Sequence, residues 1–156
     1  MRRRTFHRAV FTAAGLYNIL WGLWSVADPQ WLFRLAGMPL ANHPAVFACL
    51  GMVIGLYGIL YLDVARVPER GRLVAAVGLA GKILGPIGMF WLIATGVWPP
   101  SAAVLCVTND FIWWFPFALY LHDSSRGQIL VFAPKTSPED MKLTSPREDK
   151  CAKNKI

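Results

Sequence analysis

The chain has 156 residues, enough for one domain, and 55% of them are hydrophobic against 16% charged, which is too apolar for an ordinary soluble protein. The formal net charge of +7 could indicate nucleic-acid binding, but nearly every Lys and Arg lies at a chain end or in one loop. We therefore expect a lipid bilayer as the principal partner and no nucleic acid.

Four apolar stretches approach the roughly 20 residues that a helix needs to cross a bilayer. The predicted spans are residues 8–27, 45–62, 73–95 and 101–121, and helix-stopping or charged residues such as Pro99-Pro100 separate them. The sequence thus predicts an all-α, polytopic membrane protein, a four-transmembrane-helix bundle within residues 1–125. The tail, 126–156, mixes charge with Pro and Ser and is expected to be disordered, either solvated or in contact with anionic headgroups.

The positive residues predict the topology. Four arginines precede or begin the first span, three lie between the second and third spans, and seven Lys and Arg follow residue 121. The first outer loop carries only Arg34, and the loop around Pro99 carries none. The positive-inside rule then places both termini in the cytoplasm, in the inner membrane of the cell.

The N-terminus also resembles an export signal, because Arg3-Arg4 precedes an apolar stretch and Ser25-Val26-Ala27 resembles a cleavage site. A retained first helix is the favoured interpretation, since three further spans would otherwise lack a partner for their inner faces.

Polar residues within the apolar spans are the main candidates for a functional site. They are Asn18, Lys82, Asn109 and Asp110. An ionisable group at the bilayer centre is costly unless it is paired or hydrated, so it indicates function by default. Asn18 and Lys82 each lie about 15 Å into their spans at 1.5 Å per residue, and Asp110 reaches a similar depth from the other side. We expect a salt bridge between Lys82 and Asp110, acting either as interhelical glue or as part of a ligand or proton site.

Glycines recur at three- and four-residue spacing beside these polar residues. Gly78, Gly81, Gly85 and Gly88 lie on the side of Lys82, and Gly15 and Gly22 on the side of Asn18. Such faces are predicted to pack against other helices.

Two prolines lie inside the third and fourth spans. Pro86 frees the backbone carbonyl of Lys82, and Pro116 frees that of Ile112. Both can bend their helices and open a cavity, which we expect in the cytoplasmic half. Its predicted lining is Tyr17, Tyr57, Trp113 and Trp114.

The cysteines and histidines give weaker patterns. Cys49 and Cys106 share a depth and could form a redox pair, although buried cysteine more often behaves as a small apolar residue. His7 and His122 both fall near the cytoplasmic surface, yet without a ligand spacing they predict no metal site. No cofactor can be assigned.

In the segments 81–86 (GKILGP) and 109–117 (NDFIWWFPF), the chain resembles uncharacterised bacterial four-helix membrane proteins, broadly DoxX-like. The similarity in plan covers most of residues 8–122 and implies a bundle in the cytoplasmic membrane, in some members beside redox partners. No catalytic residue is carried over.

Three functional hypotheses remain open. The first is a midplane site that binds a small or lipophilic ligand, with coupled proton movement, in a chain that forms a homo-oligomer because four helices are few for a transporter. The second is an accessory or assembly subunit of a membrane complex. The third is a membrane enzyme acting on lipid or quinone, with Lys82, Asp110 and Tyr57 as acid and base groups.

Overall fold

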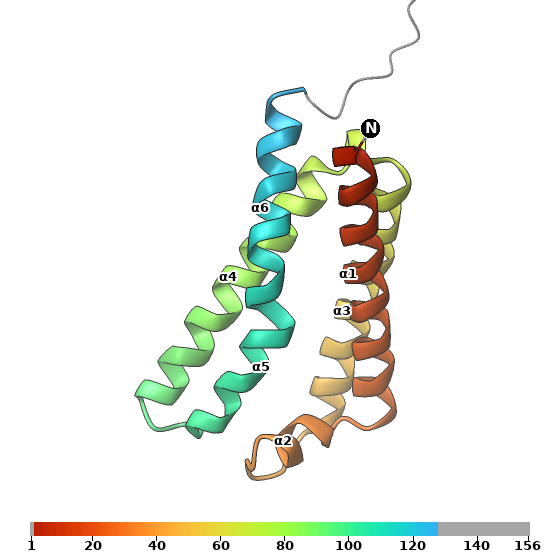
Figure 1. The fold of residues 1–156 in the computed structure, drawn as a ribbon. Coiled ribbons are helices and arrows are strands. Elements are labelled where there is room, and N and C mark those ends of the chain that lie inside the picture. The colour runs from red at the N-terminus through yellow and green to blue at the C-terminus, as the bar shows by residue number, and fades with distance from the viewer. Residues whose placement is uncertain (1, 128–156) are drawn as a thin grey trace, which may run out of the picture.

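The protein is an all-α membrane protein with four helices long and apolar enough to span a bilayer (Figure 1). The computed structural model describes residues 2–127. The helices are α1 (Arg2–Ala27), α2 (Trp31–Leu35), α3 (Pro44–Arg66), η1 (Pro68–Arg70), α4 (Arg72–Ala94), η2 (Pro100–Ala103), α5 (Val104–Cys106), η3 (Val107–Phe111) and α6 (Ile112–Ser125).

The four predicted spans are confirmed, with two corrections. The first helix begins at Arg2 rather than at residue 8, because its arginines continue the helix beyond the apolar stretch. The fourth span is not one α-helix: it starts as 3₁₀-helix, passes through α5 and the π-helical η3, and ends as α6. The short helix α2 was not predicted, and the expectation for the tail lies outside the described residues.

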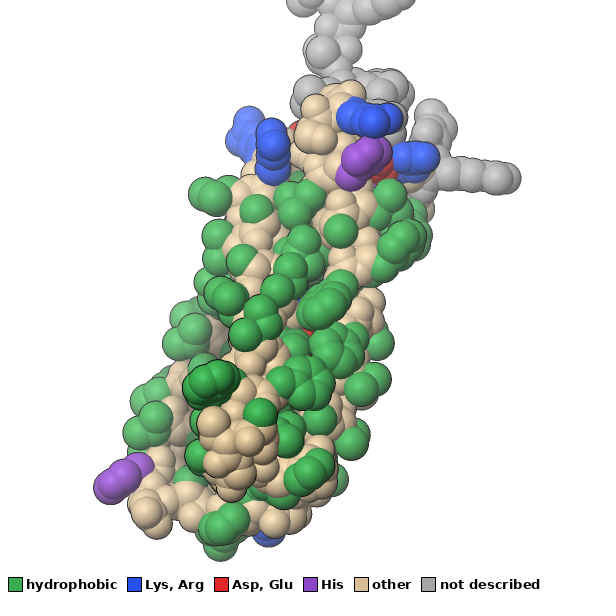
Figure 2. Space-filling model, turned by 90° about the vertical axis from the view of Figure 1, so that its left-hand side faces the viewer, with side chains coloured by type: hydrophobic (Ala, Val, Ile, Leu, Met, Phe, Trp, Pro, Cys, Tyr) green, Lys and Arg blue, Asp and Glu red, His purple; other side chains and the backbone are tan. Residues whose placement is uncertain are grey.

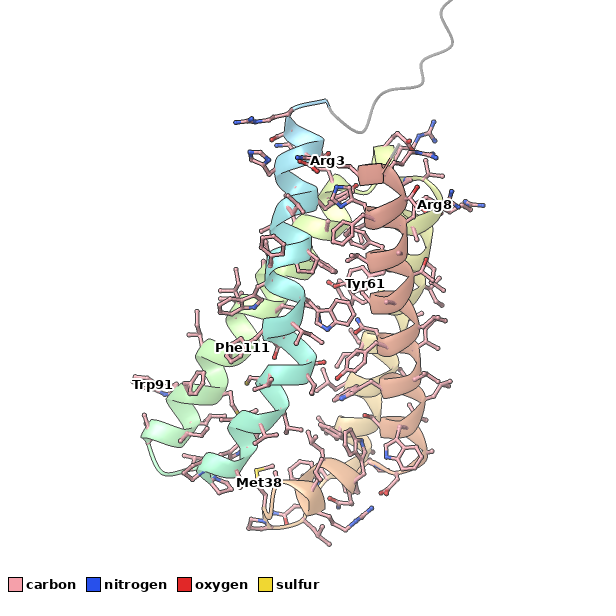
Figure 3. The ribbon with its side chains drawn as sticks, in the orientation of Figure 1. Arg3, Arg8, Met38, Tyr61, Trp91 and Phe111 are labelled. Atoms are coloured by element: carbon pink, nitrogen blue, oxygen red, sulfur yellow. The ribbon has the colours of Figure 1, made fainter. Side chains whose placement is uncertain are left out.

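The helices form two antiparallel pairs, α1 with α3 and α4 with the fourth span, which are closest at one end and splayed at the other (Figure 1). Both ends of the described chain lie at the closed end, where Arg3 Nη1 is 2.6 Å from Asp123 Oδ1. Most visible Lys and Arg side chains gather there, and hydrophobic side chains cover the middle of the face shown in Figure 2. We call this end, around Arg3 and Arg8 in Figure 3, the basic end.

Glycines allow α1 and α3 to pack backbone to backbone. A Cβ at Gly58 would lie 2.6 Å from the carbonyl oxygen of Gly15, and a Cβ at Gly22 would lie 2.5 Å from that of Gly51. Only glycine permits so close an approach, which is the usual basis of helix association in membranes. The prediction that the α1 glycines face another helix is confirmed.

The glycines of α4 differ in whether another part of the protein packs against them. A Cβ at Gly78 would meet the ring of Tyr61 in α3, and one at Gly85 would lie 3.7 Å from Asp110 Oδ2. At Gly81 and Gly88 it would meet nothing within 4 Å. The prediction that all four glycines pack against helices is therefore wrong for these two, because α3 and α4 diverge beyond Gly78.

Two clusters of buried side chains hold the bundle. The larger lies towards the basic end and comprises Phe11, Ala14, Tyr61, Val64, Ala65, Ala75, Phe117 and Tyr120. The smaller lies at the opposite end, where Ala36 and Met38 pack against Ala102 and where Ser101 Oγ donates a hydrogen bond to the carbonyl of Ala36 at 2.6 Å. A cavity lies between the two clusters.

Outward-facing side chains of the spans are large and apolar, as a helix in contact with lipid requires. Trp91, which points away from the bundle in Figure 3, is 70% exposed, and Phe115 is 74% exposed. These faces need no protein partner to be stable in a bilayer.

Candidate functional site

Pro86 lies within α4 and leaves the carbonyl of Lys82 without its helical donor. The indole Nε1 of Trp114 donates a hydrogen bond to that carbonyl at 2.9 Å. The freed acceptor predicted from the sequence is thus used in the structure, and it joins α4 to α6.

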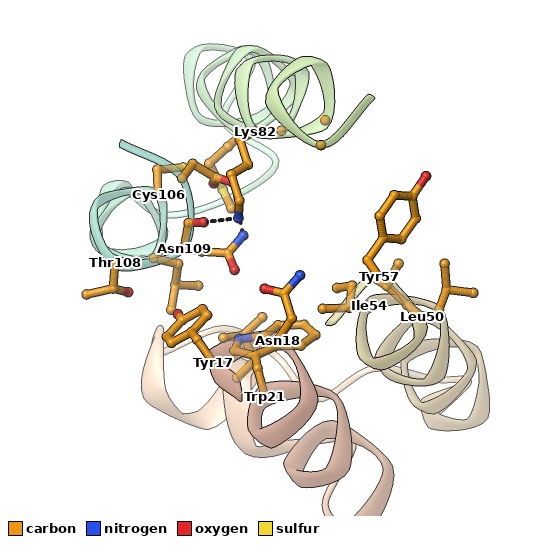
Figure 4. A pocket seen from close by; sticks show the side chains of 18 of the residues that line it. Tyr17, Asn18, Trp21, Leu50, Ile54, Tyr57, Lys82, Cys106, Thr108 and Asn109 are labelled. Atoms are coloured by element: carbon orange, nitrogen blue, oxygen red, sulfur yellow. Dashed lines mark hydrogen bonds between the residues drawn. The ribbon is translucent and has the colours of Figure 1, made fainter. Parts of the chain in front are cut away.

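The side chain of Lys82 is buried and crosses to the fourth span. Its Nζ donates a hydrogen bond to the backbone carbonyl of Asn109 at 2.6 Å, the dashed line in Figure 4, and lies 5.8 Å from the centre of the Trp113 ring. Asn109 belongs to η3, and a π-turn changes the backbone hydrogen-bonding pattern of a helix, often at functional sites.

The predicted direct salt bridge between Lys82 and Asp110 is wrong: no ion pair joins them in residues 2–127. Asp110 Oδ1 instead accepts a hydrogen bond from Asn109 Nδ2 at 3.0 Å. Asn109 therefore contacts both charged groups, one through its carbonyl and the other through its amide.

Asn18 reaches the same region from α1. It is only 5% exposed, and its amide has no hydrogen-bond partner among residues 2–127. Figure 4 shows this side chain directed into the space in front of Lys82 and Asn109. An amide without protein partners takes its hydrogen bonds from whatever occupies the cavity that it faces, so a molecule bound there can satisfy it.

These side chains line a cavity of about 630 Å³ between the two helix pairs. Its volume falls in the usual range of small-molecule sites. Much of its wall is aromatic, from Tyr17, Trp21, Trp31, Phe47, Tyr57, Tyr61 and Trp98.

The predicted site residues are partly brought together. Asn18, Tyr57, Lys82, Asn109 and Asp110 all line the cavity. The two remaining candidates, Trp113 and Trp114, lie beside it: Trp113 packs against the larger core cluster, and Trp114 bonds the Lys82 carbonyl.

The predicted position of the pocket was also wrong. The cavity extends from the bundle centre away from the basic end and reaches Trp31 of α2 and Trp98 after α4. Of the two cysteines within the described residues, the buried Cys106 lines the cavity, whereas Cys49 is exposed on α3, and both are free thiols.

A second polar cluster, at the basic end, was missed by the sequence analysis. Asp123 is fully buried, with Oδ2 3.0 Å from His7 Nε2 and Oδ1 2.6 Å from Arg3 Nη1. His122 Nδ1 lies 3.5 Å from the same carboxylate. The cluster joins the first and last described helices. The sequence placed His7 and His122 near the same surface, but it did not identify Asp123 as their common partner.

Next to this cluster, Arg4 Nε donates a hydrogen bond to Glu69 Oε1 at 2.9 Å in the connection between α3 and α4. Partial burial acts to raise the pKa of Glu69, but a backbone hydrogen bond and the Arg4 guanidinium lower it more, so its pKa lies below the ordinary 4.5.

No protein-family model matches the chain, and no curated protein or solved structure shows significant similarity to it. The DoxX-like resemblance consequently stays a prediction, and the functional argument rests on the site itself.

Proposed function

We propose that the protein is a small membrane protein whose central cavity binds a small or lipophilic ligand. The observation that carries this proposal is Asn18, whose amide has no protein partner among residues 2–127 and faces a cavity of about 630 Å³. A bound molecule can hydrogen-bond to this amide in both directions, because the amide is both a donor and an acceptor.

Proton movement is the second part of the proposal. Lys82 and Asp110 can each exchange a proton, and Asn109 contacts both. A change of protonation at one group would alter the electrostatic environment of the other, so ligand binding at this site would be sensitive to pH.

The test compares the molecules that copurify with the wild-type protein and with Asn18→Leu in a mild detergent, by organic extraction and mass spectrometry. Leu has a similar size, and its introduction breaks no protein hydrogen bond. Leu16→Ala is the matched control, since Leu16 lies on the same helix, is 51% exposed and does not line the cavity.

We expect a molecule that is enriched in the wild type and in Leu16→Ala and is at least tenfold depleted in Asn18→Leu. Adding it back should raise the melting temperature of the wild type, because a ligand that binds only the folded state stabilises it. Identical extracts from all three proteins would contradict the proposal.

An accessory subunit of a membrane complex is the second candidate. Gly81 and Gly88 favour it, since they leave room beside α4 in which a helix of another protein could pack. A stoichiometric partner that copurifies with the wild type and is lost in Gly88→Leu would support this role, and purification of the chain alone would count against it.

We further propose that the basic end faces the cytoplasm and that the host membrane is the inner membrane. The support is the excess of Lys and Arg at this end, which the positive-inside rule assigns to the cytoplasmic side. Single cysteines introduced at Arg66 and at Arg34 in a cysteine-free background should differ in labelling by an impermeant maleimide. Only the cysteine at position 34 should react in intact spheroplasts.

A further inference from the structure

The cavity is open on the side between α3 and α4. Gly78 is packed against the Tyr61 ring, whereas the next glycine on this face, Gly81, faces open space although it lines the cavity. Figure 4 shows the same separation between the helix that carries Lys82 and the helix that carries Ile54 and Tyr57. The two helices therefore leave a gap at the depth of the polar residues.

Residues at this gap both line the cavity and remain exposed. Leu50 is 48% exposed, Val53 50% and Val77 45%. A side chain with both properties stands at the rim of an opening. Because these residues belong to transmembrane helices, the opening faces the acyl chains of the bilayer.

Protein contacts lie at both ends of the cavity. Towards the basic end, Tyr61 packs against Phe11 and Phe117, with the ring centroids of Tyr61 and Phe117 5.2 Å apart. At the other end, the hydrogen bond from Ser101 to Ala36 holds η2 against the segment after α2. The gap between α3 and α4 therefore gives a molecule in the membrane a direct path to the cavity.

The polar groups in the cavity define what the occupant must offer. Lys82 Nζ carries three donors and uses one of them on Asn109, and the Asn18 amide is free to donate and to accept. Asp110 balances the charge of Lys82, so this polar region is neutral overall, both when the two groups are charged and after a proton passes between them. An oxygen acceptor without charge fits such a region better than a carboxylate or phosphate does.

We propose that the ligand is an uncharged lipophilic molecule of the bilayer, with a flat ring that bears a carbonyl or hydroxyl oxygen, and that it enters sideways between α3 and α4. The oxygen bonds to Lys82 and Asn18, the ring lies among the aromatic side chains, and an alkyl chain extends through the gap into lipid. This inference rests on the ligand-binding function proposed above and adds the ligand class and the path.

The test uses 4-dodecylbenzophenone, a neutral diaryl ketone that crosslinks on illumination. It is added to the protein in phosphatidylcholine liposomes. Labelling is followed over time, and labelled peptides are identified by mass spectrometry. Gly81→Leu places a bulky side chain at the rim, and Gly88→Leu is the matched control, because Gly88 also faces open space but does not line the cavity. Ser101→Ala loosens the contact between η2 and the segment after α2, at the end opposite the basic end.

We expect labelled peptides from the cavity wall and a rate that falls at least fivefold in Gly81→Leu but is unchanged in Gly88→Leu and Ser101→Ala. The same benzophenone with a carboxylate on its ring should label at least fivefold less than the neutral compound. Asn18→Leu should lower the extent of labelling.

Other results would overturn the inference. A rate that rises in Ser101→Ala and is unaffected by Gly81→Leu would place the path at the far end, and stronger labelling by the carboxylate would refute the neutral class. An equal loss in Gly81→Leu and Gly88→Leu would indicate that a helix of another chain occupies the gap. If labelling depends on Asn18 but not on Gly81, the sideways path fails while the ligand-binding function stands; if it depends on neither, both fail.

Discussion

The contact between α1 and α3 predicts that Gly22→Ala destabilises the protein. The new Cβ would lie 2.5 Å from the carbonyl oxygen of Gly51 and 2.9 Å from the Cα of Gly55. Both atoms are backbone, so no side chain can move aside and the two helices must separate. Overpacking of this kind typically costs about 1–3 kcal/mol, which exceeds the gain of about 1 kcal/mol or less that alanine brings over glycine in an exposed helix.

Thermal unfolding in detergent, followed by circular dichroism, tests this expectation. Subtracting the gain of about 1 kcal/mol leaves a net destabilisation of up to about 2 kcal/mol. For a chain of this length about 1 kcal/mol corresponds to about 2–4 °C, so the melting temperature should fall by up to roughly 8 °C. Gly88→Ala is the control, because its Cβ meets nothing within 4 Å, and its melting temperature should stay the same or rise slightly. Equal melting temperatures for the two variants would refute the close approach of α1 and α3.

Two further predictions concern single hydrogen bonds. Trp114→Phe removes the donor to the Lys82 carbonyl and should lower the free energy of unfolding by about 0.5–1.5 kcal/mol. Adding Pro86→Ala should recover much of this loss, because residue 86 regains the N–H that bonds to the same carbonyl. If Pro86→Ala changes the stability of the wild type and of Trp114→Phe by the same amount, the two residues do not compensate for each other. Glu69→Gln should cost up to about 1 kcal/mol at neutral pH by weakening the contact with Arg4. Because the pKa of Glu69 is lower in the folded protein, the stabilisation by its contact with Arg4 is complete above the ordinary pKa of 4.5 and is lost as the pH falls through the folded pKa. The melting temperatures of Glu69→Gln and the wild type should therefore converge in acid. A difference that stays constant with pH would contradict the lowered pKa of Glu69.

Hydropathy and residue depth were sufficient to predict the spans and the placement of Asn18, Lys82 and Asp110 around one cavity. The length of an apolar stretch and the depth of a residue within it both follow from the number of residues along the helix, which the sequence specifies directly. The consequence of Pro86 was predictable for a similar reason, because the loss of its N–H is a covalent property.

The geometry of the charged residues was not predictable in the same way. In a regular helix we expected the Asp110 carboxylate to meet Lys82, but η3 is a π-turn, and the Asn109 carbonyl receives the ammonium instead. A π-turn arises from tertiary packing and leaves no local signal in the sequence. The side of the bundle on which the pocket opens likewise depends on the angle between the helix pairs.

The two interpretations of the polar residues, a structural contact between helices and a binding site, now apply to different residues. Lys82 of α4 bonds to the carbonyl of Asn109 in η3, and the Asn109 amide bonds to Asp110, so the bond between Lys82 and Asn109 is a polar contact that holds two helices together. Asn18 contributes nothing to that contact, because its amide has no partner among residues 2–127 and faces the cavity. A polar contact between helices therefore gives Asn18 no role, whereas a ligand that bonds to both Lys82 and Asn18 does. The response of the protein to Asn18→Leu therefore separates the two roles more cleanly than any change at the charged residues, whose loss would damage both.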